Sequence, residues 1–184
     1  ANITALEEAI PEPLKAADID VNIGATWISP KYYEQFMYEL FKTPKENRSD
    51  YEPKHYWQRN GKKIEVEYSE FSGRWNIKNK SIDKSVTATK TYGAHGYTAY
   101  AIFQSVLNLT EPKVYKIKVD EFGRPIFDKN HKPISELDVP ATQVVQQKAN
   151  AIRREFKNWI FKDADRRKDI LDTYNRTFNC IKPR

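Results

Sequence analysis

The stretch "VVQQKANAIRREFKNWI", Val144–Ile160, decides the fold. Its apolar residues fall at i, i+4, i+7, i+11, i+14 and i+15, which is the spacing of one face of an α-helix. These residues are Val145, Ala149, Ile152, Phe156, Trp159 and Ile160. We therefore expect a long amphipathic helix from Pro140 onward, with this stripe against the core.

A second helix is predicted directly after the first. It begins at Asp163, a favoured N-cap residue, and its apolar face comprises Ile170, Leu171, Tyr174 and Phe178. The two helices together form a predicted helical hairpin over residues 140–184. Nearer the start of the chain, Ser29 and Pro30 provide a cap and a first-turn proline for a shorter helix, which Pro44 ends. Its apolar stripe is Tyr33, Phe36, Met37, Leu40 and Phe41.

The glycine-containing stretch "TKTYGAHGYTAYAIFQSVLNL", Thr89–Leu109, raises the question of a phosphate loop. Such loops work because free backbone N–H groups and the helix dipole converge on the anion. Here "GAHGYT" has two residues between its glycines rather than four, and Tyr97 stands where the nucleotide-binding lysine would be. We interpret the stretch as a turn that starts a middle helix. The predicted core face of that helix is Tyr97, Ala101, Phe103, Val106 and Leu107.

Two β-hairpins are predicted between the helices. The first alternates apolar and polar residues, with Ile64, Val66, Tyr68, Trp75 and Ile77 on one face. The second comprises Val114, Ile117 and Val119 around a turn at Gly123. Residues 85–91, "SVTATKT", are predicted as a further strand, residues 128–143 as a connector, and no internal repeat is apparent. The expected class is α+β, a small antiparallel sheet packed with N-terminal, middle and paired C-terminal helices.

The predicted domain organisation is an extended arm over residues 1–22 followed by one α+β domain over residues 23–184. The chain starts with Ala and its one methionine is Met37, so we expect it to be a piece of a longer polypeptide. It holds no apolar run of the roughly 20 residues that span a membrane, and its start lacks the features of a signal peptide. A single cysteine fits a reducing compartment. The expected location is cytoplasmic, without a membrane partner.

No constellation of catalytic or metal-binding residues stands out. His55, His95 and His131 lie in separate polar segments, without Cys or carboxylate at ligand spacing. Cys180 has apolar neighbours, where a free thiol behaves as a small hydrophobic residue. The alternating Glu65 and Glu67 could be paired carboxylates, but such a pair is more typical of the solvated face of a strand. We expect no catalytic residue, no cofactor and no metal in this chain.

The net charge of +6 resides in the last quarter of the chain. Residues 141–184 hold 11 Lys and Arg against 5 Asp and Glu, while the 20 and 20 elsewhere cancel. Phosphate contact requires only a basic helix flank, because it is electrostatic and independent of base sequence. The predicted nucleic-acid-binding residues are Arg153, Arg154, Lys157, Arg166, Arg167 and Lys168. A solvated helix face produces a similar pattern, so the charge alone leaves both interpretations open.

Several long blocks of the sequence resemble a known protein family. They are "GATWISPKYYEQFMYELFKTP", "RWNIKNKS", the glycine-containing stretch above and "QQKANAIRREFKNWIFKDADRRKDILDTYNRTFNCIKPR". They resemble the segment that joins an adenine-specific DNA methylase to a Swi/Snf-type helicase of the DEAD/DEAH-like class. Such proteins belong to bacterial phages, plasmids and conjugative elements. The resemblance covers about residues 10–184.

The resemblance implies a segment without catalytic residues of its own. In such parents the methylase, with its S-adenosylmethionine site and "NPPY"-type motif, precedes the segment, and the ATP-dependent helicase follows it. This sequence contains neither an "NPPY" nor a "GKT" motif. No methyltransfer or ATPase residue can therefore be assigned here, and S-adenosylmethionine and ATP are implied for the parent alone.

Three functions remain as hypotheses from the sequence. The first is a non-catalytic accessory domain that contacts DNA phosphates and connects the methylase to the helicase. The second is a purely structural module that docks the flanking modules without touching DNA. The third is a nucleotide-binding protein or enzyme built on the glycine turn, which the glycine spacing disfavours.

Overall fold

The computed structural model describes residues 11–58 and 61–179. Cys180 and the first part of the predicted arm, residues 1–10, lie outside the described residues. The helices are α2 (Pro30–Phe41), α3 (Ala99–Leu107), α4 (Val139–Trp159) and α5 (Ala164–Phe178); the strands are β1 (Val66–Ser69), β2 (Arg74–Ile77), β3 (Tyr115–Ile117) and β4 (Ser135–Leu137). The strands form two separate antiparallel pairs, β1 with β2 and β3 with β4. The predicted α+β class is confirmed.

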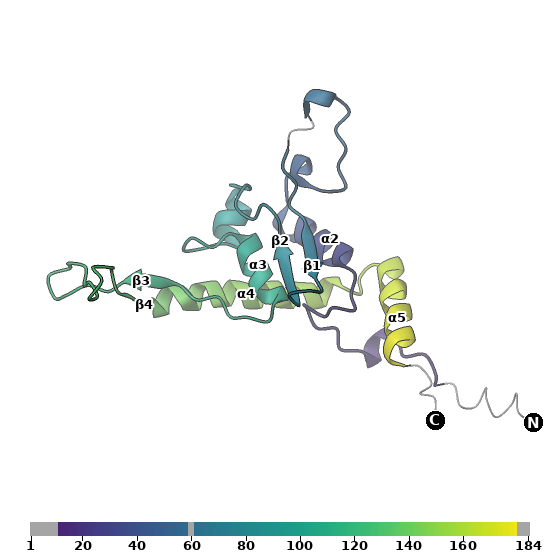
Figure 1. The fold of residues 1–184 in the computed structure, drawn as a ribbon. Coiled ribbons are helices and arrows are strands. Elements are labelled where there is room, and N and C mark those ends of the chain that lie inside the picture. Colours follow the sequence, from purple (N-terminus) through teal and green to yellow (C-terminus); the bar gives the residue numbers. More distant parts are fainter. Residues whose placement is uncertain (1–10, 59–60, 180–184) are drawn as a thin grey trace, which may run out of the picture.

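Helix α4 is the element on which the rest of the molecule is assembled (Figure 1). Its N-cap is Asp138, whose side chain accepts a hydrogen bond from the Ala141 N–H. The predicted stripe is confirmed, because Val145, Ala149, Ile152, Phe156 and Ile160 are buried, while Trp159 is half-buried. The amphipathic spacing therefore places α4 with one face in the core and the opposite face in solvent.

An aromatic cluster joins α4 to α2. The Phe156 ring stacks on Tyr33 at 5.5 Å and meets the edge of Phe36 at 5.2 Å. Tyr33 is fixed at its other end, since its hydroxyl donates to the Ala25 carbonyl and accepts from the Gly24 N–H. Burial raises the pKa of Tyr33 well above its usual value, so the hydroxyl stays protonated. The cluster fixes the position of α2 relative to α4.

Helix α2 begins and ends where the sequence predicts. Ser29 accepts a hydrogen bond from the Lys31 N–H, and Lys42 ends the helix in the left-handed conformation with φ 51°. Two tyrosines outside the predicted stripe are also buried. Tyr38 donates to the Ile64 carbonyl at 2.5 Å and Tyr32 donates to Asp169. Burial raises the pKa of Tyr38 to about 12.

Strand β2 is held against α3 by two amide side chains. Gln104 accepts from the Ile77 N–H at 2.9 Å, and Asn108 accepts from the Trp75 N–H at 2.8 Å. The first predicted hairpin is confirmed, with Val66 opposite Ile77 and Tyr68 opposite Trp75. These amides satisfy backbone donors of β2 that β1 does not reach.

The further strand predicted over residues 85–91 is wrong. Thr87–Thr91 forms a π-helical turn. Asp83 accepts from the Ser85 N–H, and the Ser85 hydroxyl accepts from the Ala88 N–H. These short side chains cap a helical turn, and that local capping prevails over the β-preference of the valine and threonines.

The middle helix α3 follows a tight glycine turn, as predicted. Its N-cap is Thr98, whose side chain accepts from the Ala101 N–H at 3.2 Å. A Cβ placed on Gly93 would lie 2.3 Å from the Ala88 carbonyl oxygen, so only glycine fits there. Of the predicted face, Phe103, Val106 and Leu107 are buried, whereas Tyr97 and Ala101 are half-buried. Ala99, Tyr100 and Ile102 are buried as well, because α3 lies between β2, α2 and α4.

The second hairpin differs from its prediction and projects from the body beside the start of α4 (Figure 1). The turn at Gly123 is present, with φ 77°. However, β3 pairs with β4, which lies in the predicted connector. The Lys118 N–H donates to Ile134, the Ile134 N–H to Ile126, and the Ile126 N–H to Lys118. We call this three-sided projection, residues 113–138, the finger.

The finger contains an internal repeat that the sequence interpretation missed. Its units are "VDEFGRPI", residues 119–126, and "FDKNHKPI", residues 127–134. The Asp120 carboxylate accepts from the N–H groups two and four residues later, and Asp128 does the same in the second unit. Gly123 and His131 occupy equivalent left-handed positions, with φ 77° and 60°. The two units resemble each other more in this hydrogen bonding than in their amino-acid sequences.

The described part of the predicted arm, residues 11–22, packs on the domain. Ile19 and Val21 belong to the hydrophobic core. Asn175 of α5 accepts from the Leu14 N–H at 2.8 Å and donates to the Leu14 carbonyl. Helix α5 crosses the end of α4 rather than lying along it (Figure 1).

Phe156→Ala is expected to lower the free energy of unfolding by about 3–5 kcal/mol, since it empties the centre of the aromatic cluster. Phe156 is fully buried, whereas Phe71 in the β1–β2 turn is fully exposed. Phe71→Ala is the matched control and should change stability by less than about 0.5 kcal/mol. Urea unfolding followed by circular dichroism measures both. Equal effects of the two substitutions would contradict this account of the core.

Candidate nucleic-acid interface

The structure separates the six predicted cations into two groups. Arg153, Arg154 and Lys157 of α4 line one open cleft. We call it the α4 cleft; its volume is about 620 Å³ and its other lining residues are Asn22, Ile23, Leu109 and Asn150. Arg166, Arg167 and Lys168 of α5 do not line it. Arg153, Arg154 and Lys157 thus share one flank of α4, as predicted. The three cations of α5 lie on a different part of the surface.

The position of the cleft follows from the helical period. Asn150, Arg153, Arg154 and Lys157 occur at i, i+3, i+4 and i+7, which places them on one flank of α4. The buried stripe occupies a different face of the same helix. The far wall of the cleft comes from Asn22 and Ile23, which precede α2, and from Leu109, two residues after the end of α3. Only tertiary packing brings those segments to the flank.

Two of the three cleft cations have acidic partners. Arg153 contacts Glu111 at 3.2 Å and Asn150 at 2.6 Å, and Lys157 contacts Asp20 at 3.7 Å. Glu111 and Asp20 are largely exposed, with side-chain exposures of 55% and 76%. Exposed pairs of this kind contribute little and exchange readily for another anion. Arg154 is exposed and has no such partner among the described residues.

Arg166 has a structural role at the end of α4. Its guanidinium donates to the carbonyls of Trp159 at 2.6 Å and Ile160 at 3.0 Å, and lies 3.5 Å from the centre of the Trp159 ring. These carbonyls lie at the C-terminal end of α4, where helical N–H donors run out. The Trp159 carbonyl also accepts from the Lys162 N–H at 3.1 Å. Burial lowers the pKa of Arg166, and Asp163 counteracts this shift. Two of the five N–H donors of Arg166 are thus engaged at the end of α4.

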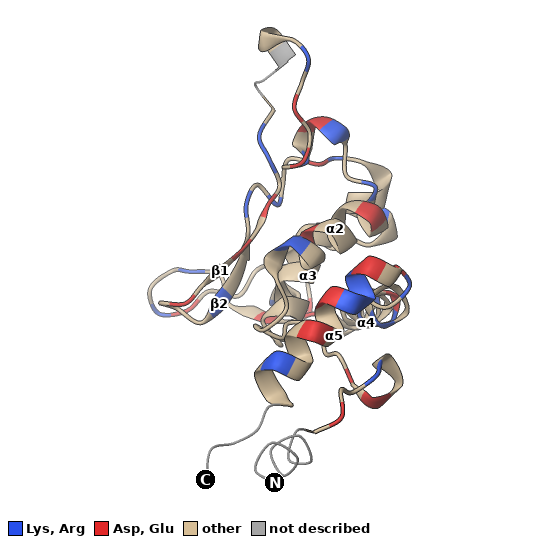
Figure 2. Ribbon diagram, turned by 90° about the vertical axis from the view of Figure 1, so that its right-hand side faces the viewer, with Lys and Arg blue, Asp and Glu red and all other residues tan. Residues whose placement is uncertain are grey.

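The surface around Arg167 and Lys168 carries mixed charge. Both acidic and basic residues occur along α5 (Figure 2). Arg167 donates to the Phe161 carbonyl at 3.3 Å. A neighbouring cleft between α2 and α5 is lined by Glu39, Asp50, Asp163, Asp165 and Asp169 together with Lys31 and Arg166. The acidic residues oppose the approach of a polyanion to this side of the molecule.

The glycine turn before α3 does not present a phosphate cradle. The ammonium group of Lys148 donates to the carbonyls of Lys90 and Gly93, at 2.8 Å for Gly93. The Thr98 hydroxyl donates to the Lys80 carbonyl and caps the helix. Carbonyl oxygens rather than free N–H groups therefore converge beside this turn, which is the wrong polarity for an anion.

The histidines show no arrangement for metal binding. His55 stacks on Trp57 at 4.7 Å, while His95 and His131 occupy left-handed turn positions. Across residues 11–58 and 61–179, no group of three or more His, Cys, Asp and Glu side chains is placed to hold a metal ion.

No helix within the same ranges is long and apolar enough to cross a bilayer.

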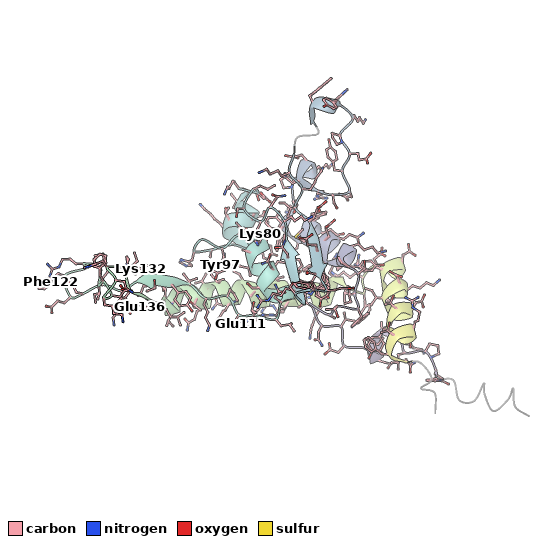
Figure 3. The ribbon with its side chains drawn as sticks, in the orientation of Figure 1. Lys80, Tyr97, Glu111, Phe122, Lys132 and Glu136 are labelled. Atoms are coloured by element: carbon pink, nitrogen blue, oxygen red, sulfur yellow. The ribbon has the colours of Figure 1, made fainter. Side chains whose placement is uncertain are left out.

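The far wall of the cleft contains a residue that the sequence interpretation missed. Leu109 follows α3 and is 76% exposed, with φ 56°. The Thr110 N–H donates to the Ser105 carbonyl, which places Leu109 at the position after a helix where glycine or asparagine is usual. The signal in the sequence is a leucine directly after the predicted helix, where glycine or asparagine would be usual. Figure 3 shows Glu111, two residues later, beside α4.

Comparison with family models assigns most of the chain. A model described as a domain of unknown function, DUF8437, matches residues 22–180. The chain belongs to the DUF8437 family. All lining residues of the α4 cleft fall within the matched range. Comparison of this DUF8437 chain with curated proteins and with solved structures gives no match.

Arg166→Ala is expected to destabilise the DUF8437 domain by about 1.5–3 kcal/mol, because two charged hydrogen bonds to partly buried carbonyls are lost. Lys168→Ala, two residues later on the exposed surface, is the control and should shift stability by less than about 0.5 kcal/mol. Thermal unfolding measures both. If Arg166→Ala leaves the midpoint unchanged, the guanidinium does not cap α4.

Proposed function

We propose that this DUF8437 domain is a non-catalytic accessory domain that binds the phosphate backbone of DNA through the α4 cleft. The supporting observation is the convergence of Arg153, Arg154 and Lys157 on one open surface. Cations held on a single helix flank contact successive phosphates without reading base sequence. The proposal narrows the predicted binding residues to those of α4, because Arg166 is engaged at the helix end.

The partial pairing of these cations fits a binding surface better than a stabilising network. A phosphate that displaces Glu111 from Arg153 exchanges one charge-assisted bond for another, so the exposed pair opposes the displacement only weakly. Arg154 has no acidic partner among the described residues that a phosphate would have to displace. Asn22 and Asn150 add neutral donors at the two walls of the cleft. Such mixed lining is usual for contacts to phosphate and sugar.

The wider context of the proposal comes from the resemblance of the sequence blocks. In that context the domain connects an adenine-specific methylase to a helicase in a cytoplasmic protein of a mobile element. S-adenosylmethionine and ATP would then serve the flanking modules and not this domain. DNA and those two modules are the proposed partners.

Arg154→Glu is expected to weaken DNA binding about tenfold and to reduce the slope of log affinity against log salt by about 1, since one phosphate contact is lost. Fluorescence anisotropy with a labelled duplex at several salt concentrations measures both quantities. Lys168→Glu is the control with the same charge change outside the cleft. An equal loss for the two variants would indicate a non-specific charge effect. If the unmodified chain binds neither the duplex nor a single strand at low salt, the proposal is refuted.

A second candidate function, docking of a flanking module, is favoured by the finger. Tyr115 lies opposite Leu137, and Val119 lies opposite Pro125. Strand alternation places Tyr115, Ile117 and Val119 on one face. These side chains are exposed by 60%, 50% and 49%. An apolar sheet face that remains about half exposed is typical of a protein interface.

The docking candidate predicts protection of the finger in the longer polypeptide. Hydrogen exchange of residues 115–119 should slow at least about tenfold there relative to the isolated domain, because backbone amides under an interface open less often. Residues 69–74 of the β1–β2 turn serve as the internal control. Ile117→Asp should abolish the protection without changing the unfolding midpoint of the isolated domain. Unchanged exchange in the longer polypeptide would rule the candidate out.

A further inference from the structure

A second cleft adjoins the α4 cleft at Leu109. It has a volume of about 260 Å³ and is lined by Thr26, Ser72, Arg74, Asn108 and Thr110, among others. Leu109 lines both clefts, and the segment Asn22–Gly24 also runs from one to the other. The two clefts therefore meet at Leu109, and we call them together the track. Arg74 lines the smaller cleft, and Lys157 lines the α4 cleft.

Leu109 is an unusual residue at its backbone position. Its backbone adopts φ 56°, a left-handed conformation that residues other than Gly, Asn and Asp rarely adopt. It also exposes 76% of its surface rather than joining the core. A residue that neither suits its backbone conformation nor packs inside contributes little to folding. Its side chain is available to a ligand that combines apolar surface with negative charge.

We propose that the track binds single-stranded nucleic acid, with phosphates on the cations and an unpaired base against Leu109. This inference rests on the proposed function and specifies its ligand. In a duplex the base faces are stacked on one another and cannot reach an apolar side chain inside a cleft. In a single strand they are free, and proteins that bind single strands combine a basic groove with side chains that contact base faces.

The dimensions and lining of the track agree with this ligand. Clefts of a few hundred Å³ accommodate single small-molecule units rather than the convex surface of a double helix. Ser72 and Thr110 place hydroxyl groups beside Leu109, where base edges and sugars require polar partners. The exposed Phe71 lies next to Ser72 in the same turn and provides a further apolar surface near the smaller cleft.

The test compares the full 184-residue chain with its Leu109→Asn variant. Asparagine tolerates the left-handed conformation, so the variant should keep or raise the unfolding midpoint. We expect it to bind oligo-dT and oligo-U about tenfold more weakly than the unmodified chain. Binding of a duplex of equal length should change by less than about twofold, because phosphate contacts are retained. Anisotropy at one fixed low salt concentration measures all three ligands.

The possible results distinguish failure of the track from failure of the proposed phosphate-binding function. Loss of single-strand affinity with unchanged duplex affinity supports the track. Unchanged single-strand affinity in the variant, or tighter binding of the duplex than of oligo-dT by the unmodified chain, overturns the track and leaves the phosphate-binding function standing. Binding of neither nucleic acid removes both. Competition by a poly-glutamate peptide as effective as oligo-dT would identify an acidic-peptide site and likewise overturn the inference.

Discussion

The packing of Phe156 between the rings of Tyr33 and Phe36 is the interaction on which the structure depends. It joins two helices that lie more than a hundred positions apart in the chain, and it does so with large flat surfaces that tolerate few alternative arrangements. Once α2 is fixed on α4, α3 fills the remaining side of the core. The strand β2 is then aligned by Gln104 and Asn108 of α3.

This arrangement also determines which charges are available. The core occupies the Val145–Ile160 stripe of α4, so the flank with Arg153, Arg154 and Lys157 is left at the surface beside Leu109. At the other end of α4, the same geometry brings Arg166 over Trp159 and uses two of its donors on helix carbonyls. Cations with similar sequence contexts therefore have different roles, and a count of charges does not distinguish them.

The finger shows how a small projecting element is stabilised without a core of its own. Asp120 and Asp128 close equivalent turns through their side chains, and three backbone hydrogen bonds join the segments in a ring. Backbone pairing substitutes for burial, which leaves Tyr115, Ile117 and Val119 exposed on one face. Figure 3 labels Phe122, Lys132 and Glu136 on this projection, well away from the α4 cleft. The two proposed interaction surfaces are thus spatially independent.

The sequence by itself determined the elements whose signals are local. The period of α4, the Ser29–Pro30 start of α2 and the alternation around Trp75 each reflect one face of a regular element, and each appears in the structure. The threonine-rich residues 85–91 and the partner of β3 were predicted incorrectly, because capping by Asp83 and pairing over some twenty positions are not expressed in local periodicity. Tertiary structure alone decided that Arg153, Arg154 and Lys157 face Ile23 and Leu109, and that Arg166 does not join them. The physical reason is that a cleft is made by segments distant in sequence, whose approach depends on how the buried side chains pack together.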